Sequence, residues 1–282
     1  MVSKAVIPAA GLGTRLLPLT RAVPKELLPA GTIPLIQLAV EEAVAAGIRE
    51  VCIVIRRGKE AIRDYFRAGP PAPTEATAGA RRLSALLRAC RICFAWQPRV
   101  RGLGDAMRCA QGFVGRESFL LIIPDQFLRG PLPASRALVA HYRFPQPTIL
   151  SSVVRVPRAE ARFFPGVRGF RLGPGPARGP RPVLDLVPAG WTPGGGSIAW
   201  GFGRTIYPPE IFPYLSPRYR DPETGEVDLW RSFQALPSSI HHRAVRLAGR
   251  PCDVGTLEGY ARYAPALAAA SRQARGRPRC AS

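Results

Sequence analysis

The sequence predicts an α/β protein built on a doubly wound, mostly parallel sheet. Apolar runs alternate with helical patterns through the first 125 residues, at the spacing of strand–helix–strand units. Two of these runs, EVCIVIR (50–56) and SFLLII (118–123), are apolar throughout, as strands covered on both faces must be. A glycine-rich loop follows the first strand, and Pro124-Asp125 follows a later one. Because ligands bind at the carboxyl ends of such strands, both loops are expected at one edge of the sheet.

In the first half, strands and helices are expected to alternate along the chain. The helical spacing after Pro34 ends at Gly47, and Pro34 itself suits a first helical turn. Residues 70–79, PPAPTEATAG, are expected to form a loop. The expected strands cover residues 4–8, 50–56, 92–97 and 118–123, and the expected helices cover 34–47, 60–67, 80–89 and 103–112.

The second half is less regular. Residues 171–196 are dense in glycine and proline and predict a long loop or a weak hairpin. A strand is expected over 197–205. Helical patterns cover 208–214, 227–236 and 256–270.

Charge and composition restrict the classes of function. The net charge is +21, but lysine occurs only at Lys4, Lys25 and Lys59, which leaves 37 arginines among the 40 basic residues. The arginines are scattered and form no stripe with interleaved aromatic residues, which argues against a nucleic-acid partner. The chain has no apolar run of 18 residues and no apolar leader, so it is expected to be cytoplasmic, without a membrane partner.

The six cysteines include one closely spaced pair, Cys90 and Cys93, at a spacing found in zinc sites. A second pair is missing, and His141, His241 and His242 have no matching ligand spacing. Reduced, partly buried cysteines and no zinc are therefore expected.

The glycine-rich loop, PAAGLGTRLLPLTRAVPKELLPAG (8–31), is the most informative segment. Gly11 and Gly13 let backbone N–H groups approach an anion closely, and Arg15 and Lys25 can neutralise a polyphosphate. The spacings of a P-loop and of a dinucleotide fingerprint are both missing. On the glycines alone, a tight turn between strand and helix explains the loop equally well.

The whole stretch is more specific than its glycines. Gly11-x-Gly13-Thr14-Arg15-x-x-Pro18-x-Thr20 followed by Pro24-Lys25 resembles the nucleotide loop of the sugar-1-phosphate nucleotidylyltransferases, and the longer match KAVIPAAGLGTRLLPLTRAVPKELLP resembles the bacterial UDP-glucose pyrophosphorylases among them. The resemblance continues at Gln97 with Gly102-Leu-Gly-Asp-Ala106, at Ile123-Pro-Asp125, and over residues 253–260, DVGTLEGY. It is weak between about 130 and 195.

The resemblance implies a three-layer α/β/α sandwich of the nucleotide-diphospho-sugar transferase type. It implies one nucleotidyltransferase domain over 1–268, with a nucleotide-binding half (about 1–130) and a sugar-binding half (about 131–268), before a disordered basic tail (269–282). The implied reaction is attack of a sugar-1-phosphate, glucose-1-phosphate first of all, on the α-phosphorus of UTP with release of pyrophosphate. A homo-oligomer, either a dimer or a tetramer, is also implied.

The resemblance also implies roles for residues of this chain. Arg15 and Lys25 would be catalytic and contact the phosphates, and Asp125 and Asp253 would hold Mg²⁺, a metal that suits two hard carboxylates. Nucleotide binding would involve Ala10, Gly11, Gly13, Gln97 and Gly102. Helix capping is an alternative for Asp125 and Asp253, and Gln97 could be an ordinary polar residue at a strand end.

The sugar-binding half departs from the pattern. The family's Glu-Lys-Pro triplet corresponds here to Leu186-Val187-Pro188, and no lysine follows Lys59. Asp185 and Arg204 are therefore speculative candidates for sugar binding, although Asp185 is shifted by one residue toward the other face of its strand. Three alternatives stay open: the same chemistry on another sugar phosphate or nucleotide, a catalytically impaired nucleotide-binding paralogue, and a nucleic-acid binder.

Overall fold

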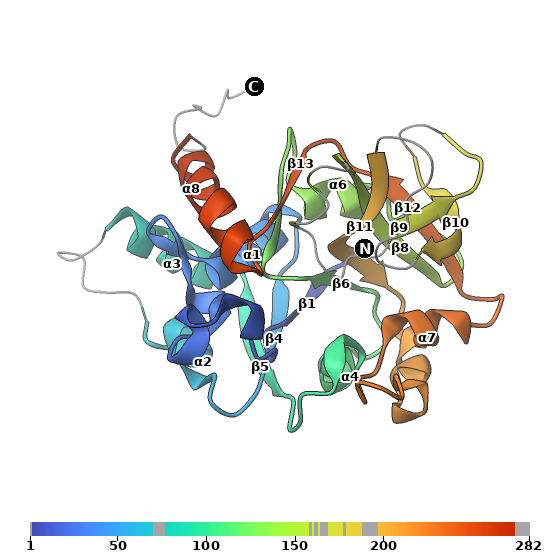
Figure 1. Ribbon diagram of the computed structural model, residues 1–282, viewed down its shortest axis with the longest axis horizontal. Helices are drawn as coiled ribbons and strands as arrows, with labels where there is room; N and C mark the ends of the chain where they lie inside the picture. Colours follow the sequence, from blue (N-terminus) through green and yellow to red (C-terminus); the bar gives the residue numbers. More distant parts are fainter. Residues whose placement is uncertain are drawn as a thin grey trace.

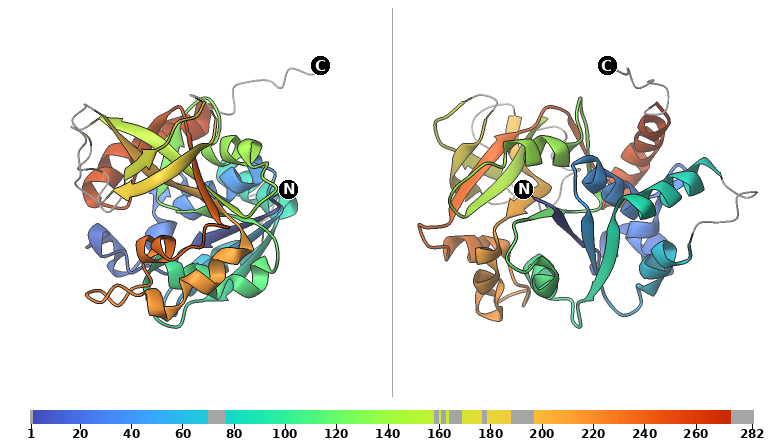
Figure 2. Two further views of the ribbon diagram at one scale, coloured as in Figure 1. Left: turned by 90° about the vertical axis from the view of Figure 1, so that its right-hand side faces the viewer. Right: turned by 180° about the vertical axis from the view of Figure 1, so that it is seen from behind.

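The computed structural model describes residues 2–69, 77–157, 160, 163, 169–176, 179–187 and 197–273. Its main feature is a nine-stranded sheet in the order β5-β4-β1-β6-β11-β8-β12-β10-β9. The right-hand view of Figure 2 shows the early strands and helices, blue to teal, at one end of the molecule and the later strands, yellow-green to orange, at the other. One sheet thus runs through both expected halves of the chain.

The early strands form the parallel part of the sheet and confirm the expected fold class. Neighbouring strands in the row β5-β4-β1-β6 are all parallel. Helices α1, α2 and α3 gather on one side of these strands and α4 on the other (Figure 1). The bounds are β1 (Lys4–Pro8), β4 (Glu50–Ile55), β5 (Arg91–Trp96), β6 (Phe119–Ile122), α1 (Leu35–Ala45), α2 (Glu60–Arg67), α3 (Ala78–Ala89) and α4 (Gly102–Cys109).

Strand β1 shows why helices are needed on both faces. Ala5 and Ile7 belong to one buried apolar cluster, and Val6, between them, belongs to the other. All three side chains are fully buried. Successive side chains of a strand point to opposite faces, so an entirely apolar strand requires a packed layer on each side.

The later strands make the sheet mixed. Strand β11 (Ser197–Tyr207) lies antiparallel between β6 and β8 (Thr148–Pro157), and β12 (His241–Arg246) lies parallel to β8. Strands β9 (Gly169–Leu172) and β10 (Arg181–Val187) pair antiparallel, which confirms the hairpin interpretation of this glycine- and proline-rich region. Residues 188–196 of that region lie outside the described residues.

Several elements differ from the expected ones. The expected helix over 103–112 is divided into α4 and α5 (Gln111–Val114), and that over 208–214 is a 3₁₀ helix (Pro209–Leu215). The prediction did not include α6 (Ala134–His141), β7 (Gln126–Arg129), β8, β12 or β13 (Arg250–Asp253). The remaining elements are the 3₁₀ turns Thr14–Leu16, Leu19–Arg21, Lys25–Leu27 and Pro217–Tyr219, the short strands β2 (Pro29–Ala30) and β3 (Ile33–Pro34), and helix α7 (Leu229–Gln234).

The last helix, α8 (Leu257–Gln273), runs beyond the expected end at 270 and into the segment expected to be a disordered tail. Residues 274–282 and most of the expected loop at 70–79 lie outside the described residues. Within the described part of the chain, no helix is both long and apolar enough to cross a membrane. The cytoplasmic location stays a prediction.

The topology brings three loops to one edge of the sheet. Strand β1 has β4 on one side and β6 on the other, so the chain winds in both directions from it and leaves a crevice at its carboxyl end. The glycine-rich loop leaves β1 there, and Asp125 follows β6. Strands β7 and β13 pair so that Gln126 lies opposite Asp253, which brings a carboxylate from near the end of the chain to the same place.

Arg204 corrects one expectation. It lies on β11 and is fully buried, and all five of its N–H donors bond inside the protein. Nε and Nη2 donate to the two carboxylate oxygens of Glu42 (2.8 and 2.7 Å), while the backbone oxygens of Ile123, Gly203 and Gln126 accept the others. Arg204 therefore has no free donor for a sugar phosphate, and its carbonyl partners Ile123 and Gln126 flank the Pro124-Asp125 loop.

We expect Arg204→Met to lower the free energy of unfolding by about 3–5 kcal/mol, because it leaves the buried Glu42 carboxylate without its ion-pair partner. The charge of Arg204 outweighs burial and holds the pKa of Glu42 below its usual value. Urea denaturation measures the loss. Arg63→Met, which removes the exposed Arg63–Asp64 pair, is the matched control and should cost less than about 1 kcal/mol. Similar small losses in both variants would contradict the buried pair.

Candidate active site

The glycine-rich loop wraps a cavity of about 360 Å³ at the carboxyl end of β1. Gly13 has a φ of +75°, in the left-handed region, and a Cβ there would lie 3.3 Å from the Thr20 side chain. The Thr20 hydroxyl donates to the Gly13 carbonyl (2.8 Å) and so closes the loop on itself. A Cβ on Gly11 would meet nothing within 4 Å. The loop is therefore tied down at Gly13 and open at Gly11, as backbone that receives a ligand must be.

Lys25, which lines this cavity, forms a direct ion pair with Asp125. Lys25 Nζ lies 2.5 Å from Asp125 Oδ2, and both side chains are largely buried. Burial alone would lower the pKa of Lys25, but the charges of Asp125 and Glu26 outweigh it and raise that pKa. Burial would raise the pKa of Asp125, yet the Lys25 charge holds it below its usual value. Both groups are therefore charged at neutral pH.

Asp125 and Asp253 form a pair of carboxylates beside Lys25. Burial first, and then the charge of Asp125, raises the pKa of Asp253 to about 7. A Cβ on Gly255 would lie 2.8 Å from Asp125 Oδ2 and 3.0 Å from Asp253 Oδ1, so glycine leaves open the space between the two carboxylates. Among the described residues, no cluster of three His, Cys, Asp or Glu side chains could hold a metal ion.

Such a pair fits a Mg²⁺-type ion, which is commonly held by one or two carboxylates together with substrate phosphates and water. Asp253 also makes a hydrogen bond of the kind that the capping alternative predicts. Its Oδ1 accepts a hydrogen bond from the Gly255 N–H (2.8 Å) in the turn before α8, and its Oδ2 accepts one from Gln126 (3.2 Å). Asp125 instead pairs with Lys25.

Gln97 and Gly102 also line this cavity. Gln97 is buried, and its Nε2 donates to the Gly102 carbonyl (3.2 Å) and to Asp105 Oδ2 (2.9 Å). Both partners are acceptors, which fixes the orientation of the amide. Both hydrogens of the amide are therefore used, and a ligand can meet only its acceptor oxygen.

The structure brings most of the expected site residues together. All seven expected phosphate and nucleotide residues line this one cavity, and Asp125 and Asp253 lie at its edge. The seven are Ala10, Gly11, Gly13, Arg15, Lys25, Gln97 and Gly102.

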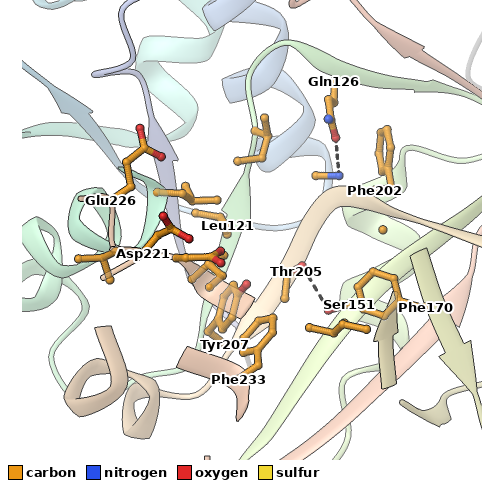
Figure 3. Close-up of a pocket in the computed structure, with 18 of the residues that line it drawn as sticks. Leu121, Gln126, Ser151, Phe170, Phe202, Thr205, Tyr207, Asp221, Glu226 and Phe233 are labelled. Carbon is orange, nitrogen blue, oxygen red and sulfur yellow. Dashed lines mark hydrogen bonds between the residues drawn. The ribbon is translucent and has the colours of Figure 1, made fainter. Parts of the chain in front are cut away.

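A second cavity of about 430 Å³ adjoins the first and shares Leu103, Ile123 and Glu226 with it. Figure 3 shows the rings of Tyr207 and Phe233 close together and the carboxylates of Asp221 and Glu226 on another wall. Among the described residues that line it, none is a lysine or an arginine. The cavity is therefore aromatic and acidic.

Asp185 lies away from this cavity, which corrects the second speculative sugar residue. Its neighbour Leu186 lines the cavity, whereas the Asp185 side chain is about half exposed and lies 3.6 Å from Arg171. Alternation along β10 explains the difference, because consecutive side chains point to opposite faces.

Three residues of the site were not predicted. Asp105 orients Gln97, Gln126 bridges Asp253 and the Gly203 N–H, and Glu226 belongs to both cavities. Of these three, Glu226 could have been suspected from the glycine at position 102. The φ of Gly102 is +83° and a Cβ there would lie 2.8 Å from Glu226, so the glycine marks the point where a distant segment packs against the loop.

Comparisons with known proteins agree with this geometry. A model of the nucleotidyl transferase family matches residues 4–168. The UTP–glucose-1-phosphate uridylyltransferase of Bacillus subtilis (strain 168) is 34% identical over 92% of this chain and 88% of its own. Two solved structures cover 98% of this chain and 100% of their own: an apo UDP-glucose pyrophosphorylase (26% identical, TM-score 0.83) and one complexed with UDP-glucose (28%, 0.78).

The raised pKa of Asp253 predicts a pH dependence of stability in metal-free protein. The folded protein keeps a proton on Asp253 that the unfolded chain releases, between about pH 4 and pH 7. The contribution of Asp253 to the free energy of unfolding is therefore largest below pH 4 and falls as the pH rises to 7. Denaturation with a chelator present, compared with Asp253→Asn, measures this fall. A difference between the two proteins that stays constant from pH 4 to 7 would contradict it.

Proposed function

The chain belongs to the nucleotidyl transferase family, with the UTP–glucose-1-phosphate uridylyltransferases among its relatives, and we propose that its two adjoining cavities carry out the transfer of the uridylyl group from UTP to glucose-1-phosphate. The chain is an enzyme that makes UDP-glucose and pyrophosphate from UTP and glucose-1-phosphate. The observation that carries the assignment to these cavities is the convergence of the glycine-rich loop, Lys25 and two carboxylates on one edge of the sheet.

The first cavity is the proposed site for UTP. Backbone N–H groups at Gly11 and Gly13 would bind the triphosphate, and Arg15 would neutralise the phosphates that leave as pyrophosphate. The free acceptor oxygen of Gln97 suits the N3–H donor of uracil. Cytosine has no hydrogen on N3, so the same oxygen would reject it. This supports a preference for UTP over CTP.

The second cavity is the proposed site for glucose-1-phosphate. Its carboxylates can accept hydrogen bonds from sugar hydroxyls, and its aromatic rings can pack against the apolar faces of a sugar ring. Because none of the described residues that line this cavity is basic, the acceptor phosphate would lie at its border with the first cavity, toward Lys25. This arrangement replaces the role expected of Arg204.

The proposed reaction is an in-line displacement at the α-phosphorus of UTP. An oxygen of the sugar phosphate forms the new P–O bond, the bond to the bridging oxygen breaks, and pyrophosphate leaves with that electron pair. The attacking oxygen is already deprotonated, so no general base is needed. Lys25 would hold the α-phosphate and the acceptor phosphate together, and catalysis consists of positioning and charge neutralisation.

A divalent metal completes the proposed site. Asp125 and Asp253 would hold it, and Mg²⁺ is proposed because it needs few protein ligands when phosphates are present. When bound, it would neutralise phosphate charge and relieve the repulsion between the two carboxylates, which adds to burial in raising the pKa of Asp253.

We expect Lys25→Ala to lower kcat by about 10²–10³, as does the loss of a group that stabilises developing charge. The measurement is pyrophosphate release with Mg²⁺, UTP and glucose-1-phosphate. Thermal denaturation checks that the variant is folded. Release at the wild-type rate from Lys25→Ala would contradict the assigned role, and no release from wild-type protein would contradict the proposed function.

Gln97→Ala should lower kcat/KM for UTP more than for CTP, because it removes the acceptor that distinguishes the two bases. The expected result is a fall of about tenfold or more for UTP and a UTP-to-CTP ratio closer to one. Steady-state kinetics with each nucleotide gives both values. An unchanged ratio would place base recognition elsewhere.

A further inference from the structure

Lys59 is a buried lysine that the proposed reaction does not use. It lies in the turn between β4 and α2, just before the first residue of α2, and is 3% exposed. Its Nζ donates to the Ala9 carbonyl (2.9 Å) and to both carboxylate oxygens of Glu26 (2.9 and 2.7 Å). Glu26 is itself only 1% exposed. All three N–H donors of the ammonium therefore have partners inside the protein.

Those partners are the two ends of the segment that forms the phosphate loop. Ala9 is the first residue after β1, immediately before Ala10 and Gly11 of the cavity wall. Glu26 directly follows Lys25 in the same 3₁₀ turn. One ammonium group thus joins the place where the loop begins to the place where Lys25 is presented.

The type of residue supports a specific role. Only three of the 40 basic residues are lysines, and Lys59 is one of them. A compact ammonium can point its three donors at a carbonyl and a carboxylate in different directions, whereas a guanidinium holds its donors in one plane. Stability alone does not account for the pair, because apolar replacements of buried ion pairs are often equally stable.

We propose that Lys59 is a positioning residue for nucleotidyl transfer: it fixes the distance between the backbone that cradles the triphosphate and the ammonium of Lys25. The inference rests on the proposed function for its effect on rate. Its effect on UTP binding follows from the loop geometry alone.

The experiment compares three variants. Lys59→Met removes the ammonium. Lys59→Met/Glu26→Gln also removes the carboxylate that would be left buried without a partner. Lys4→Met is the matched control, because Lys4 also donates to a carbonyl and pairs with a glutamate, Val114 O at 3.1 Å and Glu117 at 2.6 Å, but at the other end of β1. Each is measured for thermal midpoint, for UTP affinity by calorimetry and for kcat in pyrophosphate release.

We expect Lys59→Met to lose about 10–10²-fold in kcat, the scale of a misplaced reacting group, and about tenfold in UTP affinity. The double variant should recover thermal stability but neither kcat nor UTP affinity. Lys4→Met should keep wild-type kcat and affinity whatever its midpoint.

Recovery of kcat and UTP affinity together with stability in the double variant would overturn the inference, since a merely structural pair behaves in that way. Wild-type kcat and affinity in Lys59→Met would overturn it as well. If wild-type protein released no pyrophosphate, the proposed function would fall, and the comparison of UTP affinities would still decide the role of Lys59.

Discussion

The ion pair between Lys25 and Asp125 is the interaction on which the rest of the site depends. It joins two loops 100 residues apart in the chain, across the crevice beside β1. Each of the two loops is supported by a further buried ion pair. Lys59 and Glu26 anchor the loop that carries Lys25. Arg204, paired with Glu42, binds the backbone on either side of Asp125. Such charges are costly to bury, and the benefit we propose for them is fixed geometry where charged groups would meet a charged ligand.

In the proposed function, the two cavities divide recognition between them. The first presents backbone N–H groups and basic side chains, which suit phosphates, while the second presents aromatic rings and carboxylates, which suit a neutral polyol. Their shared wall, Leu103, Ile123 and Glu226, marks where the two substrates would meet. Leu186 and Val187 stand where the expected triplet has its charged residues, and Leu186 lines the second cavity. Leu186 is not among the described residues that line the first cavity.

Local patterns predicted the parallel sheet and the residues that line the first cavity. Continuous apolar strands require two covering layers, and the spacing from Gly11 to Lys25 lies within one loop, so both could be recognised without knowledge of distant contacts. The role of Arg204 could not, because its partner Glu42 is 162 residues away in the chain. For Asp185, alternation along a strand already indicated the other face, but the pairing of β10 with β12 could not be predicted, since β8 and β12 were not foreseen.

The position of Asp253 has a consequence for the order in which the site assembles during protein synthesis. Gln126 and Asp253, bridged in the finished site, are 127 residues apart in the chain. During synthesis, the phosphate loop, Lys25 and Asp125 all leave the ribosome before β13 exists. A nascent chain can therefore complete the parallel row β5-β4-β1-β6 while holding one carboxylate of the pair. The full pair of carboxylates arises only after β13 has been made, which ties the second carboxylate to a late step of synthesis.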